Sequence, residues 1–225
     1  MSATSHGFEH NPFATRNVRP GAIPYFFPAG VDAARLVERL AAGDWRGQII
    51  GPHGSGKSTL LTTLLPEMEA RDRRPRLIAL HDGQRRLPER LERMPEIDER
   101  AVIVVDGYEQ LGWWARWRLD RLCQRRGCGL LVTAHRPVGL PLVLETLTTA
   151  ELAEQLVERL TRDTSPIDRQ EVVARFAARG GNLREVLFDC YDLYRRRAAE
   201  STVPRVATAE ASTGGRASED FSSQA

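Results

Sequence analysis

The sequence contains few cysteines and no long apolar run, and both absences narrow the class of protein. Three cysteines among 225 residues, at irregular spacing, are not the even set of a disulfide framework. Cys123 and Cys128 are also too far apart for a CxxC redox or zinc motif. No apolar run approaches the roughly 18 residues of a membrane-spanning helix, and the first residues lack the basic and apolar segments of a secretory signal. We therefore expect a cytoplasmic protein with reduced cysteines and no membrane contact.

A large excess of charge is missing as well. The formal net charge is +2, so the overall charge gives no argument for a nucleic-acid partner. Hydrophobic residues make up 41% of the chain and charged residues 28%, as in an ordinary globular protein. The arginines are nevertheless concentrated in residues 116–126, RWRLDRLCQRR, which contain a single aspartate. Solvated helix ends often have this composition, so the cluster alone does not identify a partner.

Short apolar runs alternate with helical patterns in the first two thirds of the chain. Buried strands are expected at residues 48–50, 77–80, 101–105, 129–133 and 143–147, and helices at 33–43, 57–65 and 113–126. Pro66 should end or kink the second of these helices. This alternation predicts an α/β fold with a parallel sheet that is covered on both faces.

The pattern changes after residue 148, where only helices are expected. Capping-box spacing at Thr148 and Glu151, and again at Asn182 and Glu185, indicates two helix starts, and Ser165 with Pro166 should open a third helix. The last segment is rich in Ser, Thr, Ala and Gly and is expected to be disordered. The predicted organisation is a flexible N-terminus (1–20), an α/β core (21–148), a helical lid (149–198) and a disordered tail (199–225).

The segment GPHGSGKST, residues 51–59, lies between an expected strand and an expected helix. It matches G-x-x-x-x-G-K-[ST], in which glycines let backbone N–H groups and a helix N-terminus face a phosphate. Lys57 would neutralise the β- and γ-phosphates, and the Ser58 hydroxyl would bind Mg²⁺. The predicted nucleotide cradle comprises Gly51, Pro52, His53, Gly54, Ser55, Gly56, Lys57, Ser58 and Thr59.

A second acidic element is expected at the end of the clearest strand. Asp106 directly follows the apolar run AVIVV, at residues 101–105. A carboxylate at that strand end would face the phosphate loop and could hold magnesium through water. The pair of motifs predicts that the ligands are ATP and Mg²⁺, and the absence of an NKxD-like guanine reader favours ATP over GTP.

With both motifs in place, residues 45–198 resemble an additional-strand (ASCE) P-loop ATPase of the AAA+ group or its STAND relatives. The strand candidate RLIAL, between the two motifs in the sequence, suggests an inserted strand, and the helical segment resembles an AAA+ lid. The resemblance implies a P-loop NTPase sheet flanked by helices and followed by a small all-helical lid. It implies Thr133 as the polar sensor, with His135 and Arg136 as alternatives, and Arg184 as the lid arginine that reaches the γ-phosphate.

The sequence departs from this group directly after Asp106. Most members place a glutamate there to orient the attacking water, whereas this chain has Gly107. Glu109 is the nearest carboxylate and would return to the site only if the chain turns into a helix. Otherwise hydrolysis should be slow or absent. The sequence therefore predicts an ATPase that couples ATP binding and hydrolysis to lid movement or assembly, or alternatively a nucleotide-switched scaffold with little hydrolysis.

Several partners remain open at this point. A homo-oligomer could supply an arginine in trans from Arg116, Arg118, Arg121 or Arg136, and a protein partner could read the nucleotide state. Three tryptophans of the expected helix after Asp106 either stack on nucleic-acid bases or form its buried face: Trp113, Trp114 and Trp117. Tyr25 or Phe26 likewise either stacks on adenine or packs in the core. A small-molecule kinase is disfavoured, because no arginine-bearing insertion interrupts the α/β pattern.

Overall fold

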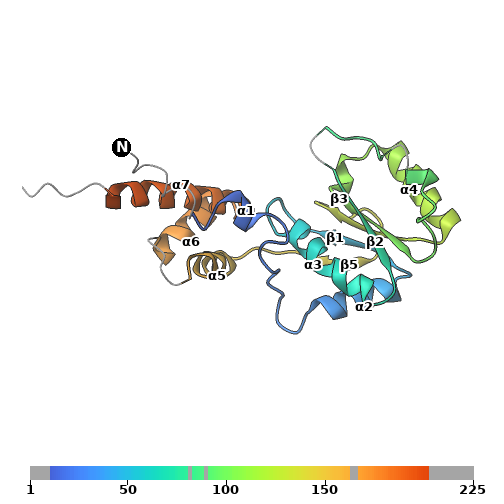
Figure 1. Ribbon diagram of the computed structural model, residues 1–225, viewed down its shortest axis with the longest axis horizontal. Helices are drawn as coiled ribbons and strands as arrows, with labels where there is room; N and C mark the ends of the chain where they lie inside the picture. The colour runs from blue at the N-terminus through green and yellow to red at the C-terminus, as the bar shows by residue number, and fades with distance from the viewer. Residues whose placement is uncertain (1–10, 81–82, 89–90, 163–166, 203–225) are drawn as a thin grey trace, which may run out of the picture.

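The computed structural model describes residues 11–80, 83–88, 91–162 and 167–202. Its centre is a five-stranded sheet in the order β2-β3-β4-β1-β5, and all neighbouring strands are parallel (Figure 1). The strands are β1 (Arg46–Ile50), β2 (Arg74–Ala79), β3 (Ala101–Asp106), β4 (Gly129–Ala134) and β5 (Leu142–Glu145). The predicted parallel sheet is confirmed.

The inserted strand of this sheet is β4, which lies between β1 and β3. The sequence had suggested RLIAL for this role, and that assignment is wrong, because RLIAL belongs to β2 at the edge. Residues 129–134 are all buried, as a central strand requires. By contrast, β2 contains arginines and an exposed Leu77, as suits a strand at the edge of a sheet. The insertion places the C-terminal end of β4, with Thr133, directly beside both β1 and β3.

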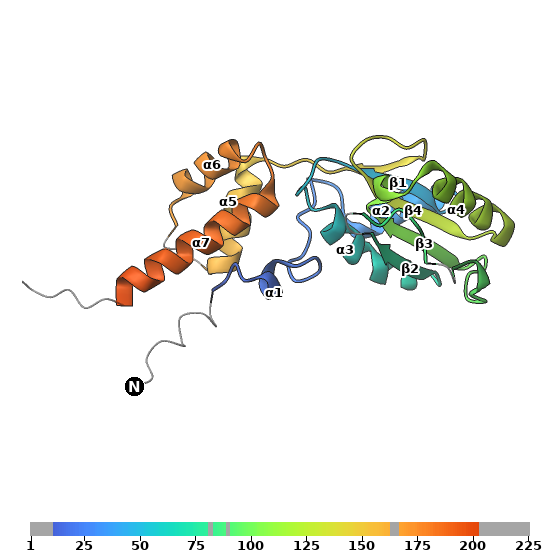
Figure 2. The same ribbon diagram turned by 90° about the horizontal axis from the view of Figure 1, so that it is seen from above.

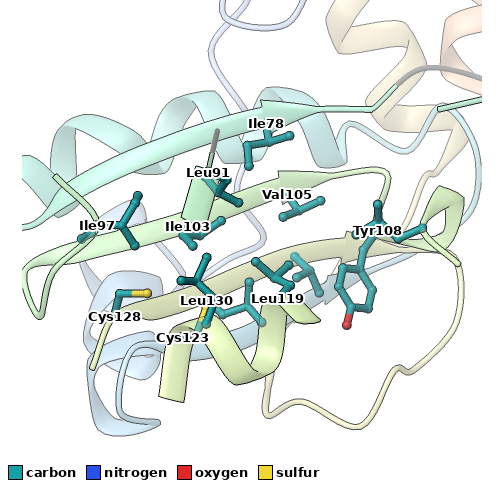
Figure 3. Close-up of a cluster of buried hydrophobic side chains, with 14 residues drawn as sticks. Ile78, Leu91, Ile97, Ile103, Val105, Tyr108, Leu119, Cys123, Cys128 and Leu130 are labelled. Carbon is teal, nitrogen blue, oxygen red and sulfur yellow. The ribbon is translucent and has the colours of Figure 1, made fainter. Parts of the chain in front are cut away.

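Helices cover the two faces of the sheet and create two apolar layers. Alternate residues of β3 point to opposite faces. On one face Val102 and Val104 pack in a cluster with α2 (Ala33–Ala42) and α3 (Lys57–Glu69). On the other, Ile103 and Val105 join a cluster with α4 (Trp113–Arg126) and the short 3₁₀ turns η1 (Leu91–Arg93) and η2 (Tyr108–Gln110), as Figure 3 shows.

Local signals in the sequence set most helix ends. The Asp32 side chain accepts a hydrogen bond from the Arg35 N–H at 2.8 Å and caps α2, which Gly43 ends. Pro66 was expected to end or kink α3, and the expected end is wrong, because α3 continues to Glu69. Met68, in this last turn, is fully buried in the core, and that burial outweighs the hydrogen bond that the proline removes.

Three further helices form a subdomain with its own apolar cluster, beside the sheet rather than on either face (Figures 1 and 2). They are α5 (Ala150–Thr161), α6 (Arg169–Ala178) and α7 (Leu183–Thr202). The cap of α5 is Thr149 rather than the predicted Thr148, whereas Asn182 caps α7 as expected. Ser165 and Pro166 lie outside the described residues, and α6 begins with a capping box at Asp168. No described helix has the length and apolarity needed to cross a membrane.

Residues 11–20 differ from the expected flexible N-terminus. They contain the short helix α1 (Thr15–Val18), and Phe13 is only 1% exposed within the cluster of the helical subdomain. The Asn11 side-chain amide donates to the carbonyl of Tyr191 on α7 at 3.1 Å. A single large apolar side chain therefore anchors a segment that has no apolar periodicity. Of the predicted tail, residues 199–202 belong to α7, and the rest lies outside the described residues, as do residues 1–10.

Candidate functional site

The loop of residues 51–56 joins the end of β1 to the start of α3 at Lys57. Gly54 and Gly56 have φ values of +70° and +86°, which side-chain-bearing residues adopt only with strain. The first turn of α3 has N–H groups without intrahelical partners, and these face the loop. The predicted cradle therefore has glycines at the two positions where the loop adopts left-handed backbone conformations.

A threonine that the sequence did not reveal fixes the base of this loop. Thr146, directly after β5, is fully buried, and its hydroxyl lies 2.6 Å from the Ser55 hydroxyl. A Cβ atom on Gly51 would lie 2.1 Å from the same Thr146 oxygen, so only glycine fits at the start of the loop. Ser55 Oγ also donates to the Pro52 carbonyl at 2.8 Å. A lone threonine after an edge strand has no pattern that could have identified this role.

Lys57 lies folded over the loop. Its ammonium group donates to the carbonyl oxygens of Gly51 and Pro52 at 2.7 and 2.6 Å. Burial lowers the pKa of Lys57, an effect that the negative charges of Glu109 and Asp106 oppose and the positive charge of Arg184 reinforces. The fold thus brings the charges of three distant predicted residues close enough to act on this lysine.

Asp106 and Thr133 meet at the carboxyl ends of β3 and β4. The Thr133 hydroxyl donates to Asp106 Oδ1 at 2.7 Å and accepts from the N–H of Gly107 at 2.9 Å. Neighbouring parallel strands end at the same sheet edge, which is why the two residues come together. The predicted polar sensor position therefore contacts the predicted metal-site carboxylate directly.

Glu109 returns toward the site through a short turn. Gly107, at φ +85°, starts the 3₁₀ turn η2, which contains Glu109. Glu109 Oε1 lies 2.8 Å from His135 Nε2, and His135 Nδ1 lies 3.1 Å from the Gly51 carbonyl oxygen. The ring of His53 lies beside that of His135, tilted by 36° with centroids 3.6 Å apart. Sequence reasoning named His135 only as an alternative to Thr133 and missed its place between Glu109 and the loop.

The second carboxylate oxygen of Glu109 has unusual surroundings. Glu109 Oε2 is buried and has no hydrogen-bond partner among the described residues. A buried acceptor without a partner is costly, and such atoms often mark a place for water or a ligand. In this arrangement one carboxylate oxygen of Glu109 is therefore both unpaired and closed off from solvent.

The tip of the loop touches the N-terminus of α7. A Cβ atom on Gly54 would lie 1.8 Å from Asn182 Oδ1 and 3.2 Å from the backbone nitrogen of Arg184. Farther along the connection, the Thr148 hydroxyl donates to the Gly181 carbonyl at 2.8 Å. The helical subdomain is thus in contact with the phosphate loop, and the backbone of Arg184 lies next to that loop.

Tyr25 lies on the other side of the loop. Its ring is 3.4 Å from the position of a Cβ atom on Gly56 and packs edge-on against Phe27, with centroids 5.0 Å apart. Burial raises the pKa of Tyr25 to about 12. Both rings pack against the cluster between α2, α3 and the sheet, so core packing accounts for Tyr25 in this structure.

Two of the four candidate trans arginines form hydrogen bonds or ion pairs within their own chain. Arg116 lies over the Tyr108 ring at 4.9 Å and donates to the carbonyls of Leu111 and Glu109. Arg118 forms an ion pair with Glu92. Arg121 and Arg136 are exposed. The hydrogen bonds of Arg116 link α4 to the turn that contains Glu109, so Arg116 is not free to act on a neighbouring copy of the chain in this structure.

The donor set fits a nucleotide-bound magnesium ion rather than a protein-bound metal centre. Among the described residues, no group of three His, Cys, Asp or Glu side chains is placed to hold a metal. Mg²⁺ commonly takes one or two protein oxygens and completes its shell with phosphates and water. Ser58 at the start of α3 and Asp106 at the end of β3 are of that kind. The three cysteines are buried and free.

Two solved structures resemble the chain over most of its length. The Walker-type ATPase PABY2304 of Pyrococcus abyssi has a TM-score of 0.53 at 12% identity, over 78% of this chain and 72% of that one. The replication initiator DnaA, bound to AMPPCP and single-stranded DNA, has a TM-score of 0.53 at 15% identity, over 79% of this chain and 65% of that one. No protein-family model matches the chain, and a search of curated proteins finds no sequence match. At these identities the likeness concerns the fold alone.

Proposed function

We propose that the chain binds ATP with Mg²⁺ and hydrolyses it, and that the nucleotide couples the core to the helical lid. The P-loop NTPase fold of the additional-strand, AAA+-like kind supports this proposal. The observation that carries this proposal is the arrangement around Lys57. A buried lysine at a glycine-rich loop feels the charges of Asp106, Glu109 and Arg184 together. Such convergence of acidic and basic groups on one phosphate cradle suits phosphoryl transfer.

The residues fit the implied ligands. Loop N–H groups and Lys57 would hold the phosphates, because the two loop carbonyls that now accept from Lys57 are weaker partners than phosphate oxygens. The Ser58 hydroxyl and the Asp106 carboxylate would hold Mg²⁺, with Thr133 orienting Asp106. When bound, Mg²⁺ would neutralise charge on the β- and γ-phosphate oxygens.

Glu109 is the residue we assign to the attacking water. His135 fixes one carboxylate oxygen, and the other, Oε2, is buried without a partner. Oε2 would accept the proton of a water that enters the site together with the nucleotide. The displaced glutamate thus takes the role that the residue after Asp106 has in related ATPases. His135 acts as a positioning residue because it contacts both Glu109 and the loop.

The lid would respond to the bound nucleotide through α7. Asn182 and the backbone of Arg184 already touch Gly54 at the loop tip. A bound γ-phosphate would attract the Arg184 guanidinium, and its loss would weaken that attraction. We propose that nucleotide state is transmitted to the lid by this contact.

The test compares nucleotide binding with phosphate release. Fluorescent ATP should bind the wild-type protein in the presence of Mg²⁺, and phosphate should be released at a rate that Glu109→Gln lowers. Glu96→Gln is the matched control, since Glu96 is exposed and lies outside the site. The absence of ATP binding would refute the proposed function.

A nucleotide-switched scaffold is the second candidate, and Gly107 in place of the usual glutamate favours it. In that case ATP would bind and alter the protease sensitivity of the lid, while phosphate release would be equally slow in wild type and Glu109→Gln. That outcome would remove Glu109 from the mechanism and retain the binding proposal.

A further inference from the structure

Helix α4 presents three tryptophans to solvent. Trp113, Trp114 and Trp117 are 75%, 56% and 47% exposed. Trp113 and Trp114 have ring centroids 4.7 Å apart, and Trp114 and Trp117 stack nearly parallel with centroids 4.9 Å apart. Tryptophan is normally well buried, so three adjacent exposed indoles require an explanation. The alternative that they form the buried face of α4 is wrong.

The packing of α4 does not need these rings. Leu119, Leu122 and Cys123 are the residues of α4 that are buried in the cluster against the sheet (Figure 3). The three indoles therefore lie on a part of the helix surface that its own core leaves uncovered. The helix itself lies at the end of the molecule opposite to the lid helices in both views (Figures 1 and 2).

The charges beside the tryptophans are positive. Asp120, the only acidic residue of α4, is paired with Arg46, and the nearby Glu92 is paired with Arg118. Arg121 lies over the Trp117 ring at 5.4 Å, and Arg125 follows one turn later. Both are exposed, and in the described part of the chain neither forms an ion pair. Cationic groups thus extend the aromatic surface along the helix.

We propose that this surface, the tryptophan face (Trp113, Trp114, Trp117, Arg121 and Arg125), binds single-stranded nucleic acid. Bases would stack on the indole rings, and the two arginines would meet the phosphates. The charge of the surface favours this partner, because Arg121 and Arg125 are exposed beside the indoles and Asp120, the acidic residue of α4, is already paired with Arg46. Exposed cations next to stacking rings suit a polyanion with unstacked bases. A duplex is a poorer ligand because its base faces are already stacked.

The proposal is tested by the binding of labelled oligodeoxythymidylate and oligouridylate of about 20 nucleotides to the full chain. Anisotropy and tryptophan quenching should both report binding, and affinity should fall as salt rises. The double variant Trp114→Ala/Trp117→Ala should weaken binding about tenfold or more. Phe188→Ala, which removes an aromatic residue that is 47% exposed on α7, is the matched control and should leave binding unchanged.

The arginines give an independent measurement. Arg121→Gln/Arg125→Gln should flatten the dependence of log affinity on log salt by about 0.7 for each phosphate contact that is lost. No binding at about 50 mM salt, or equal binding by the tryptophan double variant, would overturn the proposal. Dimerisation of the wild type that the double variant abolishes, without oligonucleotide binding, would assign the face to a second copy of the chain and would also overturn it.

This inference does not depend on the proposed ATPase activity. Binding is measured without nucleotide and repeated with Lys57→Ala, a variant that targets only the phosphate loop. Oligonucleotide binding that survives Lys57→Ala but not Trp114→Ala/Trp117→Ala would support the tryptophan face even if ATP binding fails. Conversely, ATP binding by the tryptophan double variant would show that the variant is folded.

Discussion

The phosphate loop and the tryptophan face differ in what defines their geometry and in how far solvent reaches their side chains. The loop is constrained by backbone geometry: its three glycines have positive φ values, and Gly51 and Gly54 have no room for a Cβ atom. The tryptophan face has large side chains where solvent reaches them, and these rings contact mainly one another. A change in the first region should alter the nucleotide site or the fold, whereas a change in the second should alter only an interaction with a partner.

The largest expected effect follows from removing the buried charge. Lys57→Ala should weaken ATP binding by about 10²- to 10³-fold, because the phosphates lose a desolvated cation. Fluorescent-nucleotide titration measures this loss. Oligonucleotide binding by the tryptophan face should stay at the wild-type level, and a parallel loss of both activities would break the separation of the two regions.

The sequence predicted the first region far better than the second. The existence of the strands, the phosphate motif and the Asn182 cap follow from local rules, although the bounds of β1, β2 and β5 differ from those predicted. Three contacts depend on segments far apart in the chain, so no local pattern could have identified them: His135 with Glu109, Thr146 with Ser55, and Asn182 with Gly54. The strand order was not predictable from local patterns either. The central position of β4 is evident only from the structure, where all of its residues are buried.

The tryptophans show a different limit. Positions i, i+1 and i+4 of a helix are compatible with a buried or an exposed face, since helical spacing alone does not say what lies opposite. The face of α4 was decided by Leu119, Leu122 and Cys123, which reach the sheet. Phe13 is the reverse case, because one aromatic residue without periodicity proved to be buried in the cluster of the helical subdomain.

A second prediction concerns hydrolysis within the nucleotide site. Glu109→Gln should lower the rate of phosphate release about 10²-fold or more while leaving ATP affinity nearly unchanged, because Glu109 is assigned to the water rather than to the phosphates. His135→Ala should cause a smaller loss, since the carboxylate remains but its orientation is freed. Single-turnover hydrolysis measures both rates, and a larger loss for His135→Ala than for Glu109→Gln would contradict the assigned roles.

A third prediction separates backbone strain from the contact between loop and lid. Gly54→Ala should destabilise the fold or displace the lid at a cost of about 2 kcal/mol or more, because the new Cβ atom meets Asn182 Oδ1 in addition to the strain of φ +70°. Gly139→Ala is the matched control, with φ +86° and no atom within 4 Å of the added Cβ. Chemical denaturation and limited proteolysis of the helical subdomain should distinguish the two variants. Equal effects of Gly54→Ala and Gly139→Ala would show that the contact between the loop and Asn182 adds nothing to the backbone strain.

The smallest expected effect belongs to the tryptophan face. Trp114→Ala/Trp117→Ala should change the free energy of unfolding by no more than about 0.5 kcal/mol per residue, because exposed side chains away from special contacts contribute little to folding. Thermal and chemical denaturation measure this value, with Leu119→Ala as the contrasting variant on the buried face, where a loss of about 2 to 5 kcal/mol is expected. A large loss of stability in the tryptophan variant would mean that the indole stack supports α4 itself. A small loss, together with lost oligonucleotide binding, would mean that these rings have a partner outside the chain.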